Sequence, residues 1–343
     1  MQKGYHMAKV SIIGAGSWGT ALGLLLCNNG HDVTICSENE KEIESLKEHR
    51  EHLTKLPGVK LPDEMKFTSD VRGSLSGKDL LVMAKASPYV RSTCKKYAAD
   101  IPDGQMMVNV AKGVEADTLM TMSQIIEEEV PGANVVVLSG PSHAEEVGRG
   151  LPTTIVVGAH DRKSALYVQN VFMSPVFRVY TSPDITGIEL GGALKNVIAL
   201  AAGTADGLGY GDNTKAALIT RGIAEIARLG TAMGAHAETF YGLSGIGDLI
   251  VTCASVHSRN RKAGYLIGQG KTMQQAMDEV QMIVEGVYSA KAGLTLSEKF
   301  EIETPIIQAV NQVLFENKNP KTAVDELMQR MKKDELAPDL WEQ

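Results

Sequence analysis

The chain has few cysteines. Its four, Cys27, Cys36, Cys94 and Cys253, form no CxxC pair, and most of them stand within apolar runs. Such runs are typical of reduced, buried thiols and not of a disulfide framework. This pattern excludes a small disulfide-stapled module and favours a cytoplasmic protein.

An excess of basic residues is also absent. The chain has 34 Lys and Arg against 41 Asp and Glu, a formal net charge of −7. A surface of this sign repels polyanions as a whole, so no nucleic-acid partner is expected. Any anionic ligand must therefore be captured by a local positive pocket.

Long hydrophobic runs are lacking as well. The longest apolar stretch, Leu194–Ala202, is interrupted by Lys195 and Asn196 and is far shorter than a bilayer span. Residues 1–9 contain no hydrophobic segment of the kind that signal peptides carry. Neither a membrane span nor a signal peptide is predicted, and because no HExxH motif or paired Cys and His spacing occurs, no metal site is expected either.

What the chain does have is enough length and apolar content for two globular domains. It contains 343 residues, of which 43% are hydrophobic, more than one core usually supports. In the first two thirds, short β-branched runs alternate with amphipathic helical segments, the pattern of a parallel sheet covered on both faces. Strands are predicted at Val10–Ile13, Val33–Cys36, Leu80–Met83, Met106–Val110, Val135–Leu138, Thr154–Val157 and Phe177–Tyr180.

The hydrophobic period changes near Asp184. Beyond it the strand signals stop and the pattern is helical throughout. We therefore predict an α/β, Rossmann-type doubly wound parallel sheet over residues 1–184, followed by an all-helical substrate-binding domain over residues 185–343. Helices between the strands are predicted at Thr20–Asn29, Pro88–Ala99 and Leu119–Val130, the second with Ser87 as its N-cap.

A glycine fingerprint follows the first predicted strand. Gly14, Gly16 and Gly19 form GxGxxG directly after an apolar strand and directly before a helix. In that context the first glycine permits a tight turn, the second lets the backbone approach a pyrophosphate, and the third lets helix and strand pack closely. The helix N-terminus attracts the phosphates, so a dinucleotide site is predicted here.

Glu38 stands at the end of the second predicted strand, 19 residues after Gly19. An acidic side chain near this spacing accepts from the adenosine ribose 2′-hydroxyl and repels a 2′-phosphate. The nearest cation in the sequence, Lys41, falls in the next helix. Glu38 therefore favours NAD over NADP.

Lys195 occupies an unusual position in an apolar helical run. Its neighbours at i−4, i−3 and i+4 are Gly191, Gly192 and Ala199, and these small residues are expected to leave a hollow beside the amine. A lysine that is partly desolvated has a lowered pKa and can exchange a proton with a carbinol oxygen near neutral pH. Lys195 is thus a candidate acid and base.

Further polar residues follow the next two strands. Lys112 comes just after Met106–Val110, and ligands of doubly wound sheets bind at the carboxyl ends of strands. The segment 139–144 follows the next strand and offers backbone amides and a hydroxyl at a helix start. Both segments are candidates for substrate contact.

The helical part contains two further candidate segments. Asp248 lies in a tight glycine turn that enters a helix, as its N-cap or as a ligand. Ser258, Arg259 and Asn260 begin another helix. Backbone N–H groups, a guanidinium and amide and hydroxyl donors at one helix start make a site for a monophosphate.

Together these motifs closely resemble the NAD(P)-dependent sn-glycerol-3-phosphate dehydrogenase family of bacteria. They occur in the family's order from residue 8 to about residue 335. The segments that carry the resemblance are Gly14 to Ala21, Ala111 to Gly113, Ser139 to Ser142, Glu189 to Asn196, Gly245 to Leu249, Ser258 to Arg261 and Val284 to Gly286.

The resemblance implies residue roles. Lys195 would be the proton acceptor and donor, and Lys112 would touch both substrate and nicotinamide. Substrate contacts are implied for Gly140, Ser142, Asp248, Ser258, Arg259 and Asn260, and Asn196 and Thr252 lie beside these motifs as further candidates. Cofactor contacts are implied for Ser17, Trp18, Ala144, Arg259, Ile283 and Glu285. The segment 37–39 departs from the family, where many relatives place His or Arg.

The expected activity is the interconversion of sn-glycerol 3-phosphate and dihydroxyacetone phosphate with NAD or NADP, which supplies glycerol 3-phosphate for phospholipid synthesis. The family also suggests a homodimer. Two alternatives remain open at this point. One is another two-domain β-hydroxyacid dehydrogenase, because Arg259 would serve a carboxylate as well as a phosphate. The other is a non-catalytic dinucleotide-sensing module.

Overall fold

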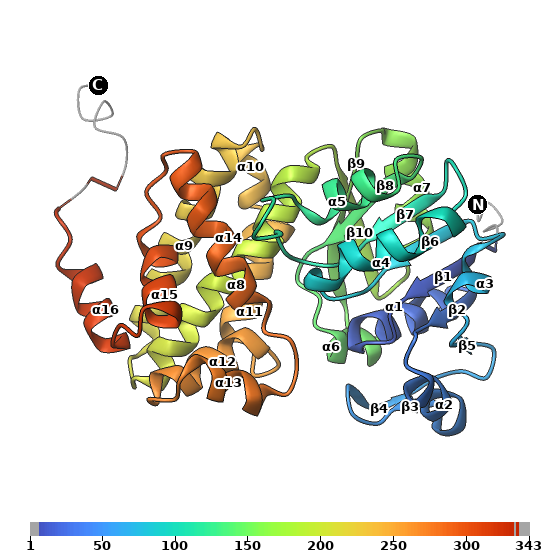
Figure 1. The fold of residues 1–343 in the computed structure, drawn as a ribbon, viewed down its shortest axis with the longest axis horizontal. Coiled ribbons are helices and arrows are strands. Elements are labelled where there is room, and N and C mark those ends of the chain that lie inside the picture. Colours follow the sequence, from blue (N-terminus) through green and yellow to red (C-terminus); the bar gives the residue numbers. More distant parts are fainter. Residues whose placement is uncertain (1–6, 333, 336–343) are drawn as a thin grey trace.

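The structure is a computed structural model that describes residues 7–332, 334 and 335. The outer ends of both predicted domains, residues 1–6 and 336–343, lie outside the described residues. Figure 1 shows a sheet with helices on both faces and, beside it, a separate group of helices formed by the later part of the chain.

Within the described residues, eight strands form one sheet in the order β10-β9-β8-β7-β6-β1-β2-β5. They are β1 (Lys9–Ile13), β2 (Asp32–Cys36), β5 (Lys66–Thr68), β6 (Leu80–Met83), β7 (Met106–Asn109), β8 (Asn134–Ser139), β9 (Thr153–Ala159) and β10 (Phe177–Ser182). All seven predicted strands are confirmed. The sequence analysis missed β5 and a separate hairpin of β3 (Glu51–His52) and β4 (Leu56–Lys60).

The sheet departs from the prediction of an all-parallel arrangement at one place. Strands β8 and β9 run antiparallel, with Ser139 opposite Val156, whereas the other neighbouring pairs in this sheet are parallel. The connection between them contains the five-residue helix α6 (Ala144–Gly148) and returns the chain beside β8 in the opposite direction. The doubly wound part of the sheet therefore ends at β8.

Two apolar layers enclose the sheet. Side chains of α1 and α7 pack on one face, and those of α3, α4 and α5 pack on the other, where Ile13, Leu81 and Met107 are buried. The helices of this part are α1 (Ser17–Asn28), α2 (Glu40–His49), α3 (Val71–Leu75), α4 (Val90–Tyr97), α5 (Met122–Glu129) and α7 (Arg162–Phe172).

Three predicted helix starts were wrong, the first because α1 begins at Ser17 and not at Thr20. Ser87 is not an N-cap: it begins a 3₁₀ turn over Ser87–Tyr89 that precedes α4. Leu119 lies outside α5 with a positive φ of 62°, and Thr121 caps α5 in a reciprocal box with Gln124. Capping by hydroxyl and amide groups sets the start of α5, which the apolar pattern alone placed too early.

The second part is helical throughout the described residues, as predicted. Its helices are α8 (Ile185–Gly207), α9 (Asp212–Ala232), α10 (Ala237–Phe240), α11 (Asp248–Ala254), α12 (Arg259–Gly268), α13 (Met273–Val280), α14 (Glu285–Lys299), α15 (Pro305–Phe315) and α16 (Pro320–Met328). A turn over Leu243–Gly247, η3, precedes α11. Helix α8 is long and apolar enough to cross a membrane by composition, but 89% of its most apolar window is buried inside the protein, as in a core helix.

Glycines bring α8 and α12 into backbone contact. A Cβ at Gly203 would lie 2.0 Å from the Arg261 carbonyl oxygen, and one at Gly264 would lie 2.1 Å from the Leu200 carbonyl oxygen. Neither position admits a side chain without moving a backbone. This close crossing places the N-terminus of α12 beside Asn196 of α8, where the Asn260 amide donates to the Asn196 side chain at 2.9 Å.

Candidate active site

The glycine fingerprint forms a turn that only glycine fits at two of its positions. Gly14 has a φ of 124°, and a Cβ there would lie 2.6 Å from the Ala84 carbonyl oxygen. A Cβ at Gly19 would lie 2.2 Å from the Gly14 carbonyl oxygen. A Cβ at Gly16, in contrast, would meet no protein atom within 4 Å. The protein itself does not require Gly16, which fits a backbone approach by a phosphate.

The N-terminus of α1 and Trp18 offer hydrogen-bond donors beside this turn. No side chain caps α1, so its first N–H groups, beginning at Ser17, are available to an anion. The Trp18 indole Nε1 is buried and has no hydrogen-bond partner in the described residues. An orphaned buried donor next to an uncapped helix start fits a dinucleotide, which supplies acceptor oxygens. Ala144, the first residue of α6, is buried and belongs to the same apolar layer.

Glu38 lies at the end of β2, as predicted, but its nearest cation is not Lys41. The Lys96 ammonium on α4 contacts Glu38 Oε1, and the Tyr97 hydroxyl donates to the same oxygen at 2.5 Å. These donors, Lys96 first, hold the pKa of Glu38 below its usual range. The pair joins residues 58 positions apart, which no local pattern could indicate.

Asp248 brings the two candidate lysines together. The carboxylate, at the first position of α11, accepts from Lys195 through Oδ1 and from Lys112 through Oδ2, the latter at 2.7 Å. Lys195 also donates to the Thr252 hydroxyl at 2.7 Å. Lys112 comes from the loop after β7 and Lys195 from α8, so this cluster spans the two parts of the molecule.

Burial and charge set the protonation of this cluster. Burial lowers the pKa of Lys195 to about 7, with Lys112 adding to the shift and Asp248 opposing it. Burial would raise the pKa of Asp248, but Lys112 and Lys195 outweigh it and hold that pKa below its usual range. The carboxylate therefore stays ionised while Lys195 can gain or lose a proton near neutral pH.

The predicted hollow beside Lys195 is wrong. A Cβ at Gly191 would lie 2.6 Å from the Ser244 carbonyl oxygen, so this glycine admits the backbone of η3. A Cβ at Gly192 would lie 3.0 Å from Ser139 Oγ and 3.5 Å from Lys112 Cγ. The two glycines thus make room for protein groups that close around the lysines, and burial replaces the hollow as the cause of the lowered pKa.

Residues after β8 complete the surroundings of Lys112. The Lys112 ammonium donates to the Gly140 carbonyl oxygen at 3.0 Å, and the Ser142 hydroxyl donates to the same oxygen at 2.9 Å. Ser139 Oγ is buried and has no hydrogen-bond partner in the described residues. No role was predicted for Ser139, and its unpaired hydroxyl marks it as a further polar group of the site.

At the start of α12, where a monophosphate site was predicted, only some of the side chains are free to bind a ligand. Arg259 is exposed and makes no ion pair within the described residues, whereas Ser258 caps α12 by accepting from the Arg261 N–H at 3.2 Å. Asn260 is committed to the protein: besides donating to Asn196 it accepts from the Gly286 N–H at 2.8 Å. The Arg259 guanidinium is therefore the available cation here.

Glu285 joins the helical part to the sheet part. At the start of α14, it accepts from the backbone N–H of Ser87 at 3.1 Å and from the Ser87 hydroxyl. Burial raises the pKa of Glu285 above its usual value. Ile283, two residues before it, is half-buried. The contact places residues predicted to line a cofactor across from the loop after β6.

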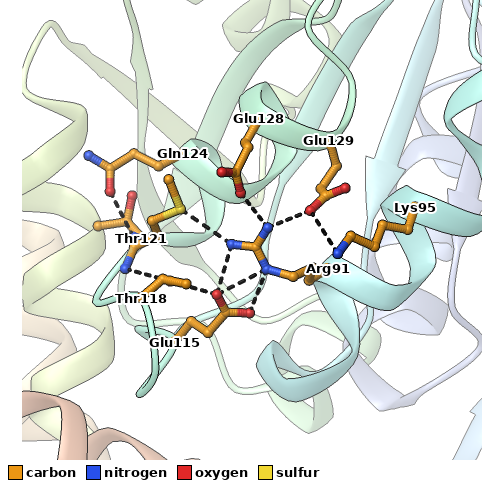
Figure 2. A network of polar contacts seen from close by, with 9 residues as sticks. Arg91, Lys95, Glu115, Thr118, Thr121, Gln124, Glu128 and Glu129 are labelled. Atoms are coloured by element: carbon orange, nitrogen blue, oxygen red, sulfur yellow. Dashed lines mark hydrogen bonds and ion pairs between the residues drawn. The ribbon is translucent and has the colours of Figure 1, made fainter.

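Arg91 braces the loop that carries Lys112, a feature the sequence analysis missed (Figure 2). The guanidinium donates to both oxygens of Glu115, three residues after Lys112, and also contacts Glu128 and Glu129 of α5. These carboxylates, Glu115 first, raise the pKa of Arg91. Helix α4, the loop and α5 are thereby tied together on one side of the site.

Burial makes two of the cysteine thiols weak acids. The four cysteines are free, and burial raises the pKa of Cys94 and of Cys253 to about 12. Among the described residues, no group of three or more His, Cys, Asp or Glu side chains is placed to hold a metal ion. Within the cluster, Lys195 has a pKa near neutral pH and can therefore exchange a proton there.

Comparisons with known proteins agree with this arrangement. Residues 9–165 match the family model of the NAD-dependent glycerol-3-phosphate dehydrogenase N-terminus, and residues 184–325 match that of the C-terminus. A glycerol-3-phosphate dehydrogenase [NAD(P)+] of Agathobacter rectalis is 63% identical over 98% of this chain and 100% of its own length. The enzyme of the same name from Fusobacterium nucleatum is 60% identical over 96% of this chain and 99% of its own length.

A solved structure shares the whole fold. The glycerol-3-phosphate dehydrogenase of Coxiella burnetii superposes with a TM-score of 0.91 at 32% identity, covering 94% of this chain and 99% of the other. Both family models, the curated relatives and the Coxiella burnetii structure indicate one family. The chain belongs to the NAD-dependent glycerol-3-phosphate dehydrogenase family.

Proposed function

We propose that this member of the family interconverts sn-glycerol 3-phosphate and dihydroxyacetone phosphate at the cluster of Lys195, Lys112 and Asp248. One observation carries this assignment: a buried carboxylate bonds one lysine from each part of the molecule. Lys195 has a pKa of about 7 because of burial, so it can serve both directions of the reaction.

Lys195 is the proton donor and acceptor in this proposal. When bound, the nicotinamide supplies or removes a hydride at C2 of the substrate. During reduction the Lys195 ammonium protonates the developing alkoxide, and during oxidation the neutral amine accepts the proton from the hydroxyl. Lys112, which bonds the other oxygen of Asp248, stabilises the same substrate oxygen. Thr252 and Asp248 hold Lys195 in place through the hydrogen bonds described above.

Arg259 anchors the phosphate group of the substrate away from the reacting carbon. It is exposed, unpaired in the described residues and stands at the start of α12, where N–H groups add to the attraction. Binding energy at the phosphate orients C2 toward Lys195. The proposed substrate contacts are Lys112, Gly140, Ser142, Lys195, Asn196, Asp248, Thr252, Ser258, Arg259 and Asn260.

The cofactor lies along the edge of the sheet where the strands end. The proposed contacts are Gly14, Gly16, Ser17, Trp18, Gly19, Glu38, Lys112, Ala144, Arg259, Ile283 and Glu285. Glu38 accepts from the adenosine ribose, because its Oε2 has no hydrogen bond within the described residues. NADH is therefore expected to serve at least as well as NADPH. Comparing kcat/KM for both cofactors in the parent and in Glu38→Ala tests this, since a strong NADPH preference unchanged in the variant contradicts it.

Four broader features complete the proposal. The dinucleotide-binding domain spans residues 1–184 and the substrate domain residues 185–343. The protein acts in the cytoplasm as a homodimer, in keeping with its reduced cysteines and with the apolar helices of the second domain. Its physiological role is the supply of glycerol 3-phosphate for phospholipid synthesis.

The deciding experiment is a steady-state assay of the purified protein with dihydroxyacetone phosphate and each reduced cofactor. Turnover of dihydroxyacetone phosphate together with no turnover of unphosphorylated dihydroxyacetone supports the proposal. Faster turnover of hydroxyacids or their keto acids would assign the chain to another β-hydroxyacid dehydrogenase. Cofactor binding without turnover of any small phosphate would leave only a dinucleotide-sensing module.

A further inference from the structure

Helix α4 holds the Glu38 carboxylate, which is expected to bind the adenosine ribose. Lys96 and Tyr97 both bind Glu38 through its Oε1 atom and leave Oε2 without a hydrogen bond in the described residues. The Lys96 side chain is 56% exposed, so its ammonium faces solvent as well as Glu38. A cation is therefore built into the place where the sequence indicated only a negative charge.

A second lysine adds positive charge at the same edge. Lys85 follows β6, and its backbone nitrogen lies 3.3 Å from where a Cβ of Gly14 would stand. Lys85 is half-buried and makes no ion pair within the described residues. Its charge adds to the effect of Lys96 in lowering the pKa of Glu38, and it opposes burial, which raises the pKa of the Cys36 thiol. Lys96 therefore contacts the Glu38 carboxylate directly, and Lys85 acts on it from the end of β6.

The other cation near Tyr97 is already committed. Arg72 of α3 lies over the Tyr97 ring at 5.7 Å from its centre and forms an ion pair with Asp100 at 2.8 Å. Lys95, the neighbour of Lys96, lies toward Glu129 of α5 at 3.6 Å. Lys96 and Lys85 are therefore the cations that a ligand beside Glu38 can engage.

We propose that Lys96, assisted by Lys85, is the group of this chain that binds the 2′-phosphate when the cofactor is NADPH. With NADH, Glu38 accepts from the ribose hydroxyl and Lys96 remains on Glu38. With NADPH, the Lys96 ammonium is shared with the phosphate, whose higher charge and three acceptor oxygens make it the stronger partner. This inference rests on the proposal that Glu38 lies at the adenosine ribose.

Binding of cofactor fragments to the whole protein tests this site without turnover. Titration calorimetry with adenosine 2′,5′-bisphosphate and with 5′-AMP separates the 2′-phosphate from the rest of the adenosine. In Lys96→Met we expect affinity for the bisphosphate and for NADPH to fall about 10-fold to 100-fold, the range of a charge-assisted hydrogen bond. Affinity for 5′-AMP and NADH is expected to stay within about threefold. Lys85→Met is expected to act in the same direction with a smaller effect.

Lys95→Met is the matched control. It removes the neighbouring charge on α4, whose ammonium lies near Glu129 and not near Glu38. It is expected to leave both fragments' affinities unchanged. An equal loss in Lys95→Met and Lys96→Met would reveal a general effect of surface charge and would overturn the proposed site.

A double-mutant comparison distinguishes a direct contact between Lys96 and the 2′-phosphate from an indirect effect of Lys96 through the charge of Glu38. Glu38→Gln frees Lys96 and is expected to tighten binding of the bisphosphate, and adding Lys96→Met is expected to abolish that gain. If the double variant binds the bisphosphate as tightly as Glu38→Gln, Lys96 does not contact the phosphate. If Lys96→Met weakens 5′-AMP as much as the bisphosphate, Lys96 only orients Glu38. If Glu38→Gln changes neither fragment, Glu38 is not at the ribose, and the cofactor part of the proposed function fails as well.

Discussion

The buried carboxylate of Glu189 accepts a hydrogen bond from the side-chain amide of Asn109 at 3.0 Å. Glu189 lies on α8 six residues before Lys195, and Asn109 ends β7 three residues before Lys112. The Oδ1 atom of the Asn109 side chain accepts from the Ala111 N–H at 3.0 Å, which fixes the start of the lysine-bearing loop. This contact therefore ties the helix that carries Lys195 to the strand that precedes Lys112.

Replacement of Glu189 is expected to misplace the lysines without touching the substrate. Glu189 also accepts from the backbone N–H of Ser123 at 2.9 Å and from its hydroxyl at 2.5 Å, and burial raises its pKa. Glu189→Ala leaves these donors unpaired, so we expect a loss of about 1–3 kcal/mol in stability and a lower kcat. Glu189→Gln keeps an acceptor of the same shape and is expected to restore most of both. Equal kcat in the parent and the alanine variant, measured well below the unfolding temperature, would contradict a positioning role.

Removal of the proposed proton donor gives the most direct test of the reaction centre. Lys195→Met is expected to lower kcat by at least about 10²–10⁴-fold, the typical contribution of general acid–base groups. NADH affinity, measured by fluorescence titration, is expected to stay close to that of the parent because the glycine turn is intact. Lys262→Met, at an exposed position of α12, serves as the control. Near-parental kcat in Lys195→Met would remove this lysine from the mechanism.

The pH dependence follows from the pKa of Lys195, about 7. Reduction needs the ammonium, so kcat/KM for dihydroxyacetone phosphate is expected to fall as pH rises through about 7. Oxidation needs the neutral amine and is expected to gain rate over the same interval. Because Asp248 opposes the lowering of this pKa, Asp248→Asn is expected to move the transition to lower pH. Initial rates in both directions from pH 5.5 to 9 measure it, and a flat profile would contradict the assignment.

Arg259 is expected to act through the phosphate of the substrate. Arg259→Ala removes the unpaired guanidinium at the start of α12 and is expected to raise KM for dihydroxyacetone phosphate about 10-fold or more. Inorganic phosphate is expected to compete with substrate in the parent and to lose most of that effect in the variant. A variant that still distinguishes dihydroxyacetone phosphate from dihydroxyacetone as well as the parent does would place the phosphate site elsewhere.

Short-range patterns predicted much of the nucleotide-binding half. The spacing of Gly14, Gly16 and Gly19 between an apolar strand and a helix predicts the tight turn from neighbouring residues, although the group that Gly14 approaches, the Ala84 carbonyl, comes from another strand end. The seven predicted strands follow from β-branched runs in the same way. The strands β3 and β5 were missed because they have two and three residues, and β4 was missed because Pro57 and Gly58 interrupt it, so that none of them has the continuous apolar run of the predicted strands.

The surroundings of Lys195 could be predicted from the sequence only in part. Lys195 was singled out from its apolar surroundings, and the structure buries it as those surroundings suggest. The reason given for its pKa was wrong, because Gly191 and Gly192 admit the η3 backbone and Lys112 in place of a hollow. Which groups fill the space beside a small residue depends on segments far away in the chain, and only their packing reveals them.

By itself, then, the sequence determined the elements and the residue types of the site, since turn geometry, apolar period and helix starts act over a few neighbouring residues. The tertiary structure alone decided how those residues are paired. Asp248 joins Lys112 from 136 positions away, and Lys96 reaches Glu38 from 58. The physical reason is that the pKa of a lysine and the net charge at a ribose site depend on burial and on the nearest charges in space, which the fold sets and spacing along the chain does not.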